Sequence, residues 1–480
     1  MGFKIVDEQT ENPFSKLVSG QTIVEVPEFT LESGDKIFKV PVAYKTWGKL
    51  NDKGDNCMLI AHALTGSADV KDWWGPLIGR DRAFDPTKFF IICLNSLGSP
   101  YGSASPVTMD GEYNERYGPE FPLCTVRDDV RIHKLVLDSL GVKQIAVCIG
   151  GSMGGMLALE WCFVDGGKFV RSLVALATSA RHSAWCISWG EAQRQCIYSD
   201  PKYDDGYYSL DDPPVSGLGA ARMAALLTYR SRNSFEKRFG RGAPTQQQKS
   251  KDLSNTPVSE DSSAVEDSPS TKEENWQIHN DGAAVRSRKS FESRHASRSN
   301  SIDSSLSSAD SDSIDSSVSG KKPRRRPQHY FSAQSYLRYQ AQKFHQRFDA
   351  NCYISITRKL DTHDVGRDRP EFDNDAAKAL QSLQIPALVI GIDSDALFTL
   401  SEQIFIAKNI PNSTLKKIHS PEGHDAFLLE FKEINDLVMD FEKTHLKEIM
   451  DHDGNNMDWS DETVQQKESV FGEAEDVANW

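Results

Sequence analysis

The residues from Lys143 to Trp161, KQIAVCIGGSMGGMLALEW, place a serine among four glycines. Before Ser152 the run IAVCI is apolar and rich in β-branched residues, which is typical of a buried strand. After it, the apolar residues of MGGMLALEW predict a helix packed on a sheet. Glycines permit strained dihedrals and close backbone approach. The sequence therefore predicts a sharp strand-to-helix turn at a residue that carries a hydroxyl.

The residues Gly150, Ser152 and Gly154 match GxSxG, the pattern of a nucleophile elbow. In such an elbow the backbone N–H after the serine, here that of Met153, faces a developing oxyanion. The alternative is a glycine-rich turn of some other α/β protein, including one that cradles a phosphate. Partners of the serine must decide between the two.

A serine hydroxyl needs a general base, and the base needs a carboxylate to orient it. In elbow enzymes the chain order is serine, then an acid, then histidine. Asp393 and Asp395 end a predicted strand in VIGIDSDALF, and His424 lies in the loop of SPEGHDAFL. Either aspartate could instead cap the next helix, and a single histidine in a loop is more often a surface residue.

The context of the other histidines is less favourable than that of His424, because strand, loop and helix surround His424 as they surround Ser152. The competing residues are His182, His329, His345, His363 and His419. A second oxyanion donor is expected after an early strand, in LIAHALTGSAD, from the N–H of Leu64 or Thr65. His62 precedes the serine, which is the wrong order for a base, so we expect it to be structural.

Strand-like runs alternate with helical stretches along most of the chain. Several runs are continuously apolar, as in strands covered on both faces, and the alternation predicts a mostly parallel sheet in an α/β fold. The runs are FKVPVAYKTWG, NCMLIAHALTG, KFFIICLNSLG, KQIAVCIGG, VRSLVALATSA, IPALVIGIDSD and STLKKIHSPEGHD.

The alternation of strands and helices stops between about 181 and 350. There, amphipathic helical sequences such as GLGAARMAALLTYRSRNSFEKRF predict a helical lid inserted into the sheet domain. Within it, about 240–327 is a serine- and charge-rich tract that we expect to be disordered. The core would then comprise residues 1–180 and 351–445, and the second of these ranges would also contain the end of the lid. We expect residues 446–480 to form an acidic tail. The run KKPRRRP is either a solvated basic segment, the preferred interpretation, or a nuclear-import or nucleic-acid patch.

Bulk properties exclude several classes of protein. A formal net charge of −14 argues against a nucleic-acid binder. Eight cysteines without a CxxC motif argue against a zinc site and a disulfide framework, and favour reduced core thiols. No leader-like segment or run of membrane-spanning length is expected, so the prediction is a cytoplasmic protein with no membrane and no nucleic-acid partner.

Five ordered motifs, HALTGSAD, GGSMGGMLALEW, ARMAALLTYRS, IGIDSDALF and EGHDAFLLE, resemble those of the homoserine O-acetyltransferase family. The resemblance runs from about Phe38 to Glu430, apart from the serine-rich tract. It implies the α/β-hydrolase fold. It also implies the catalytic triad Ser152, Asp395 and His424.

The same resemblance maps the oxyanion donors onto Leu64 and Met153, and the substrate-binding residues onto Arg222 and Asp425. A guanidinium fork suits the carboxylate of homoserine, and a carboxylate suits its ammonium group. Without the resemblance, Arg222 could equally be a surface residue of a lid helix and Asp425 a helix N-cap.

The implied reaction is a ping-pong transfer of an acetyl group from acetyl-CoA to L-homoserine, in methionine biosynthesis, with no bound cofactor and no metal. Relatives imply a homodimer through lid helices. Within the same family or fold, the alternatives are a succinyl donor, a serine acceptor, or an esterase that uses water. A catalytically inactive scaffold is a further alternative.

Overall fold

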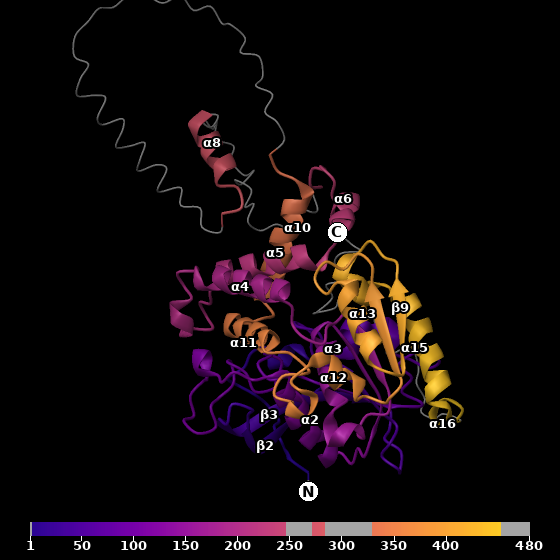
Figure 1. Ribbon diagram of the computed structural model, residues 1–480. Coiled ribbons are helices and arrows are strands. Elements are labelled where there is room, and N and C mark those ends of the chain that lie inside the picture. The colour runs from indigo at the N-terminus through magenta and orange to yellow at the C-terminus, as the bar shows by residue number, and fades with distance from the viewer. Residues whose placement is uncertain (1, 246–270, 284–328, 453–480) are drawn as a thin grey trace, which may run out of the picture. The chain divides into compact units, whose positions relative to one another are not determined.

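The structure, a computed structural model, describes residues 2–245, 271–283 and 329–452 (Figure 1). The chain divides into two compact units. One comprises Met1–Arg238 and Gln340–Trp480, and the other Phe239–Tyr339. The sheet and every residue proposed above for the site belong to the first unit, so that unit is described in most detail.

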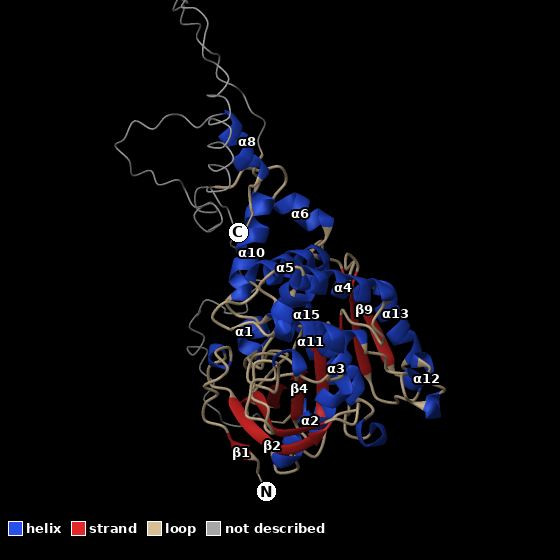
Figure 2. Ribbon diagram, turned by 90° about the vertical axis from the view of Figure 1, so that its left-hand side faces the viewer, coloured by secondary structure: helices blue, strands red, loops and turns tan. Residues whose placement is uncertain are grey.

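The first unit is built on a nine-stranded sheet with the order β1-β2-β3-β5-β4-β6-β7-β8-β9 (Figure 2). β1 to β3 and the β3–β5 pair are antiparallel, and every pair from β5 to β9 is parallel. The strands are β1 (Lys4–Ile5), β2 (Thr22–Thr30), β3 (Lys36–Trp47), β4 (Cys57–Ala61), β5 (Phe90–Leu94), β6 (Ile145–Gly151), β7 (Leu173–Leu176), β8 (Ala387–Ile392) and β9 (Ser413–Ile418).

All seven predicted strands are present, as β3 to β9, and the mostly parallel sheet is confirmed. The sequence analysis missed β1 and β2. β1 has only two residues, both exposed, and so carries no pattern. β2, TIVEVPEFT, is interrupted by a proline and two glutamates, and it is held by its antiparallel pairing with β3.

Helices cover both faces of the sheet, which confirms the predicted double coverage. The apolar side chains of α2, α3, α12 and α13 share one core cluster with Ile145 and Cys148 of β6. Those of α1, α15 and α16 share the other with Val147 and Ile149 of the same strand. The α-helices are α1 (Val70–Trp74), α2 (Val126–Ser139), α3 (Met153–Trp161), α4 (Ala184–Tyr198), α5 (Val215–Tyr229), α6 (Arg232–Arg238), α8 (Thr271–His279), α10 (Ser332–His345), α11 (Ala350–Asp361), α12 (Ala376–Gln381), α13 (Leu400–Asn409), α14 (Ala426–Leu429), α15 (Phe431–His445) and α16 (Lys447–Met450).

The predicted lid region contributes helices α4, α5 and α11 to the first unit. α11 is fixed to the core by a fully buried ion pair, in which Lys359 Nζ lies 2.5 Å from Asp129 Oδ2 of α2. Lys359 also donates to the carbonyl of Leu97 at 2.6 Å. A buried charge without such partners would be costly, so the pair fixes the position of α11 against α2.

Most of the predicted disordered tract, residues 246–270 and 284–328, lies outside the described residues. Within the tract the structure describes the helix α8, which the sequence analysis did not anticipate. In the second unit, Arg338 Nη2 lies 2.9 Å from Asp281 Oδ2, shortly after α8. The lid boundaries 181–350 remain a prediction.

The predicted acidic tail begins with residues that are packed. Leu446, Ile449 and Met450 are buried in the core cluster of α15. Residues 453–480 lie outside the described part of the chain.

All eight cysteines are free thiols, and seven of them are buried, as expected of reduced core residues. Among the described residues, no helix is both long and apolar enough to cross a membrane.

Glu442 of α15 gives a prediction about stability. Its side chain is fully buried, and within the described residues neither carboxyl oxygen has a hydrogen-bond partner. Burial, with the nearby charge of Asp85, raises its pKa well above the usual value. The folded protein therefore retains a proton that the unfolded chain loses, and stability falls as pH rises above about 4.5.

We expect Glu442→Gln to remove this dependence, so that the gain in free energy of unfolding is larger at pH 8 than at pH 5. Urea unfolding at both pH values measures it. Glu433→Gln, at an exposed position of the same helix, is the control and should show no such difference. An equal effect of Glu442→Gln at both pH values would contradict the argument.

Candidate active site

Ser152 sits between β6 and α3 with φ 57° and ψ −126°, a conformation that residues with a side chain rarely adopt. The backbone is held there from both sides. Ser152 N donates to Leu176 O at 3.0 Å, and Thr178 Oγ1 donates to Ser152 O at 2.7 Å. The sharp turn predicted at this serine is therefore present, and the strain falls on the serine itself.

The flanking glycines let backbone segments approach each other closely, and they do not adopt unusual dihedral angles. A Cβ on Gly150 would lie 2.1 Å from the carbonyl oxygen of Gly154, and a Cβ on Gly154 would lie 2.1 Å from that of Ala61. Neither glycine has a positive φ. Only residues without a side chain let α3 start this close to β6 and β4.

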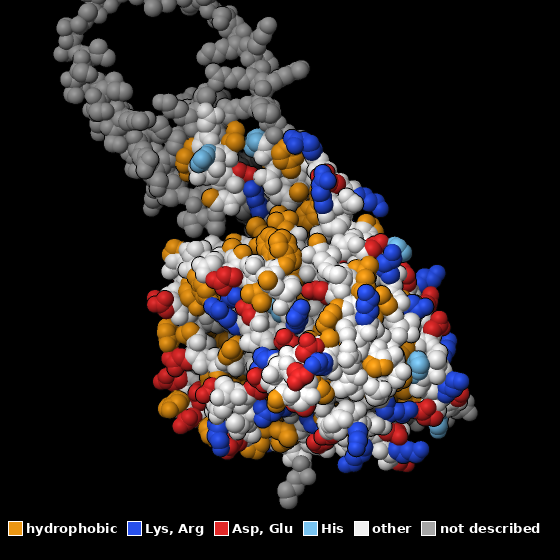
Figure 3. All heavy atoms as spheres, viewed as in Figure 1, with side chains coloured by type: hydrophobic (Ala, Val, Ile, Leu, Met, Phe, Trp, Pro, Cys, Tyr) orange, Lys and Arg blue, Asp and Glu red, His pale blue; other side chains and the backbone are white. Residues whose placement is uncertain are grey.

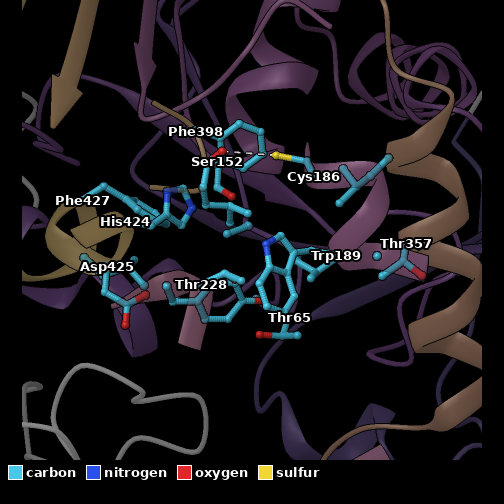
Figure 4. A pocket seen from close by; sticks show the side chains of 18 of the residues that line it. Thr65, Ser152, Cys186, Trp189, Thr228, Thr357, Phe398, His424, Asp425 and Phe427 are labelled. Atoms are coloured by element: carbon cyan, nitrogen blue, oxygen red, sulfur yellow. Dashed lines mark hydrogen bonds between the residues drawn. The ribbon is translucent and has the colours of Figure 1, made fainter. Parts of the chain in front are cut away.

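His424 and Asp395 form the expected pair, with Nδ1 2.7 Å from Oδ2. The other oxygen of Asp395 accepts the backbone N–H groups of Leu397 at 2.8 Å and Phe398 at 2.9 Å. Ser152 and His424 line one cavity, in which their side chains face each other (Figure 4). The structure thus brings together the three residues predicted as the triad.

The other aspartate, Asp393, pairs with a different histidine. Its Oδ2 lies 2.7 Å from Nδ1 of His419, whose side chain is largely exposed. Asp393 Oδ1 accepts the N–H of Ser420 at 3.3 Å. The alternative left open by the sequence therefore corresponds to a surface pair.

Ser394, between the two aspartates, joins the loop after β8 to the loop that carries His424. Its hydroxyl accepts the N–H of Gly423 at 2.9 Å and donates to the carbonyl of Ser420. The residue preceding His424 is therefore fixed directly to the loop that carries Asp395. This link has no signature in the sequence beyond the position of a serine in IDSD.

The pKa of His424 is set by two opposing effects. Burial lowers it, but the charge of Asp395, the hydrogen bond to Asp395 and the charges of Asp425 and Glu402 together outweigh burial. The net result is a pKa above the ordinary value for histidine. Burial and the charge of Asp395 in turn raise the pKa of Glu402 to about 7.

Leu64 and Met153 remain the predicted oxyanion donors. Met153 is the first residue of α3, so its N–H has no acceptor within the helix. Leu64 lines the same cavity as Ser152. His62 lies in the loop that carries Leu64: its Nε2 accepts the N–H of Ser96 at 3.0 Å, its Nδ1 lies 2.8 Å from Ala63 O, and burial lowers its pKa to about 4. The expectation that His62 is structural agrees with these contacts.

Asp425 lines the cavity, whereas Arg222 does not belong to its lining. The side chain of Arg222 is 1 % exposed, and its guanidinium carbon lies 4.8 Å from the ring centre of Phe344 and 5.6 Å from that of Tyr229. Tyr229 does line the cavity. Arg222 is thus a buried residue behind this wall rather than a surface residue of the lid.

The sequence analysis missed Arg230, which follows α5 in the motif ARMAALLTYRS. Its Nε lies 2.9 Å from Asp425 Oδ2, and its guanidinium also pairs with Glu422. Arg230 therefore holds the residue next to His424 from the lid side. Arg230 is therefore a candidate residue for positioning Asp425. Its presence in the motif ARMAALLTYRS could have indicated this role.

Other members of the cavity wall carry no motif and were also missed. They are Trp73, Cys186, Trp189, Gln193, Thr357 and Leu360. Among the residues that the structure describes, no group of three or more His, Cys, Asp or Glu side chains could hold a metal ion.

Comparison with known proteins shows the family and the fold of the chain. Residues 56–431 match the model of the alpha/beta hydrolase fold family. The chain is 58 % identical over 482 residues to the homoserine O-acetyltransferase of Saccharomyces cerevisiae, covering 98 % of this chain and 96 % of the other. The chain belongs to the homoserine O-acetyltransferase family, within the alpha/beta hydrolase fold.

Solved structures share the fold of this family. An esterase superposes with a TM-score of 0.64 at 21 % identity, over 88 % of this chain and 98 % of the other. The homoserine O-acetyltransferase of Bacillus anthracis superposes with a TM-score of 0.62 at 18 % identity, over 88 % and 96 %. Esterases and acetyltransferases are thus alike in fold, and the fold does not separate them.

The two aspartates give the first prediction about the site. Asp395→Asn should lower kcat by about 10³- to 10⁴-fold, because the amide no longer stabilises the charged imidazole or fixes its tautomer. Asp393→Asn is the matched control, since it removes the same charge two residues away and should leave kcat within about 2-fold. Equal losses in both variants would contradict the assignment of Asp395.

The raised pKa of His424 predicts a shifted pH profile. His424 must be neutral to accept a proton, so kcat/KM should fall on the acid side with an apparent pKa above 6.5. Glu402, whose pKa is about 7, is partly ionised in this range, so Glu402→Gln removes a partial negative charge that favours the imidazolium, and it should move this limb to lower pH. Initial rates from pH 5 to 9 measure the shift, and a limb that moves to higher pH would contradict the role of Glu402.

Proposed function

We propose that this protein is a homoserine O-acetyltransferase that transfers an acetyl group from acetyl-CoA to the side-chain hydroxyl of L-homoserine, a step of methionine biosynthesis. The observation that carries the proposal is the cavity in which Ser152 faces a His424–Asp395 pair with Asp425 beside it. Similarity to homoserine O-acetyltransferases over almost the whole chain supports the same conclusion.

In the first half-reaction, His424 Nε2 accepts the proton of Ser152 Oγ as Oγ attacks the thioester carbonyl. Asp395 stabilises the resulting imidazolium, as its contribution to the pKa of His424 indicates. The N–H groups of Leu64 and Met153 donate to the oxyanion. Collapse of the tetrahedral intermediate breaks the C–S bond, and His424 returns its proton to the departing thiolate of CoA.

In the second half-reaction, His424 accepts the proton of the homoserine hydroxyl, whose oxygen attacks the acyl-enzyme. Breaking the bond to Ser152 releases O-acetyl-L-homoserine and restores the serine proton. Asp425 is placed to hold the ammonium group of the acceptor, and Arg230 orients Asp425. We assign the carboxylate of homoserine to Arg222, whose fork suits a carboxylate and whose guanidinium carbon lies 5.6 Å from the ring centre of Tyr229 in the cavity wall.

The competing function is that of an esterase, in which water attacks the acyl-enzyme. A charged residue in the cavity wall favours the transferase, because a zwitterionic acceptor needs an opposite charge and water does not. Similarity in fold alone cannot decide between them.

The proposed enzyme is a cytoplasmic homodimer that needs no bound cofactor. A homodimer through lid helices fits the exposed apolar side chains there, such as Leu227 of α5, which is 54 % exposed; Figure 3 shows apolar side chains gathered near α5. A cytoplasmic location fits eight free cysteines. No bound cofactor is required, since acetyl-CoA is a substrate.

The two half-reactions can be measured separately. Mixed with acetyl-CoA alone, the protein should release about one equivalent of CoA and gain the mass of one acetyl group. Ser152→Ala should show neither change. Asp425→Asn should keep the burst of CoA but lower kcat/KM for homoserine by about 10²-fold, because it weakens a charge-assisted contact that orients the acceptor.

Asp436→Asn, which removes a carboxylate from α15, is the control and should leave both half-reactions unchanged. Hydrolysis of acetyl-CoA at the same rate with and without homoserine would contradict the proposal in favour of an esterase.

A further inference from the structure

The wall of the cavity that α4 forms differs in chemistry from the wall that carries Asp425. α4 contributes Cys186, Trp189, Gly190 and Gln193, none of which is charged. Across the cavity lie Ser152, His424 and Asp425 (Figure 4). One side of the cavity therefore suits a charged ligand group, and the α4 side suits a neutral one.

Trp189 supplies this neutral wall with a hydrogen-bond donor. Its indole Nε1 is buried, and no described residue accepts a hydrogen bond from it. Figure 4 shows the indole nitrogen directed into the cavity, toward the space beside Ser152 and His424. A buried N–H without an acceptor is unfavourable, so a ligand carbonyl placed here gains a contact that the free protein lacks.

Trp185 extends the same face of α4 toward the surface. It lies four residues before Trp189, and the two rings meet edge to face with centroids 5.7 Å apart. Its indole N–H donates to Ala396 O at 3.1 Å, so the ring is fixed although it is 56 % exposed. An aromatic surface thus leads from solvent to Trp189.

We infer that the face of α4 formed by Trp185, Cys186 and Trp189 binds the pantetheine arm of acetyl-CoA, with the indole N–H of Trp189 donating to an amide carbonyl of the arm. The arm is an uncharged chain of apolar segments and two amides, which matches a neutral wall with one unused donor. Homoserine is a zwitterion, and its charged groups match Asp425 and Arg222 instead. This inference rests on the proposed function.

The test compares two acetyl donors. Trp189→Phe keeps an aromatic ring, although a smaller one, and removes the N–H, so kcat/KM for acetyl-CoA should fall about 5- to 15-fold, as for loss of one hydrogen bond. In a ping-pong scheme this ratio reports the first half-reaction alone, so kcat/KM for homoserine should not change. With p-nitrophenyl acetate, which has no pantetheine arm, acylation of Ser152 should also be unchanged. Trp185→Ala should show the same selectivity for the acetyl-CoA reaction.

Trp161→Phe is the matched control. Trp161 of α3 also has a buried Nε1 without a described partner, but it packs against Phe169 in the core and does not line the cavity. Its replacement should leave all three measurements unchanged.

Three results would overturn the inference. These are an unchanged kcat/KM for acetyl-CoA in Trp189→Phe, an equal loss with p-nitrophenyl acetate, and a loss confined to homoserine. Each leaves the proposed function standing, provided that the parent protein transfers acetyl groups to homoserine. A parent protein that makes no acetyl-enzyme from acetyl-CoA would overturn the proposed function, and this inference with it.

Discussion

The active site depends on one backbone constraint, the positive φ of Ser152 at the junction of β6 and α3. The neighbouring chain leaves no room to relax it. α3 starts so close to β6 and β4 that a single added carbon at Gly150 or Gly154 would overlap a carbonyl oxygen. Hydrogen bonds from Ser152 to Leu176 and from Thr178 to Ser152 complete the hold. The serine hydroxyl is thus positioned by packing of the whole central sheet.

His424 is positioned by a second, independent feature, the contact between the loops that follow β8 and β9. The loops after β8 and β9 are neighbours because those strands pair in parallel, from Ala387 with Ser413 to Ile392 with Ile418. The hydroxyl of Ser394 in the first loop bonds to the backbone of the second loop, at Gly423 N and Ser420 O. The side chain of Asp395 in the first loop bonds to that of His424 in the second. The geometry of the base therefore follows from the register of one strand pair. The nucleophile and the base meet because β6, β8 and β9 run parallel in one sheet, with only β7 between β6 and β8, so the loops at their carboxyl ends lie at the same edge.

Charge and burial are balanced around this geometry. His424 is buried, which by itself disfavours the imidazolium, yet three carboxylates around it reverse the direction of the shift. Asp425 raises the pKa of His424 while its own charge is paired with Arg230. On the other side, α4 presents a neutral wall whose one buried indole N–H has no described acceptor. The cavity is thus divided into a charged side and a neutral side, as two chemically different substrates require.

The sequence by itself determined seven of the nine strands, the elbow at Ser152, His424 and the lid helices, because each rests on local periodicity, on glycine content or on a motif. Local pattern left Asp393 and Asp395 undecided, and only the family resemblance favoured Asp395, since two carboxylates two residues apart look alike until a fold gives each a different histidine. Apart from the presence of Arg230 in a motif, it gave no sign of the Ser394 link or the Arg230–Asp425 pair, both of which join segments far apart in the chain, or of the buried indole N–H of Trp189 beside the cavity. Such contacts depend on which side chains the parallel sheet and the inserted helices bring face to face, and only the tertiary structure decided that.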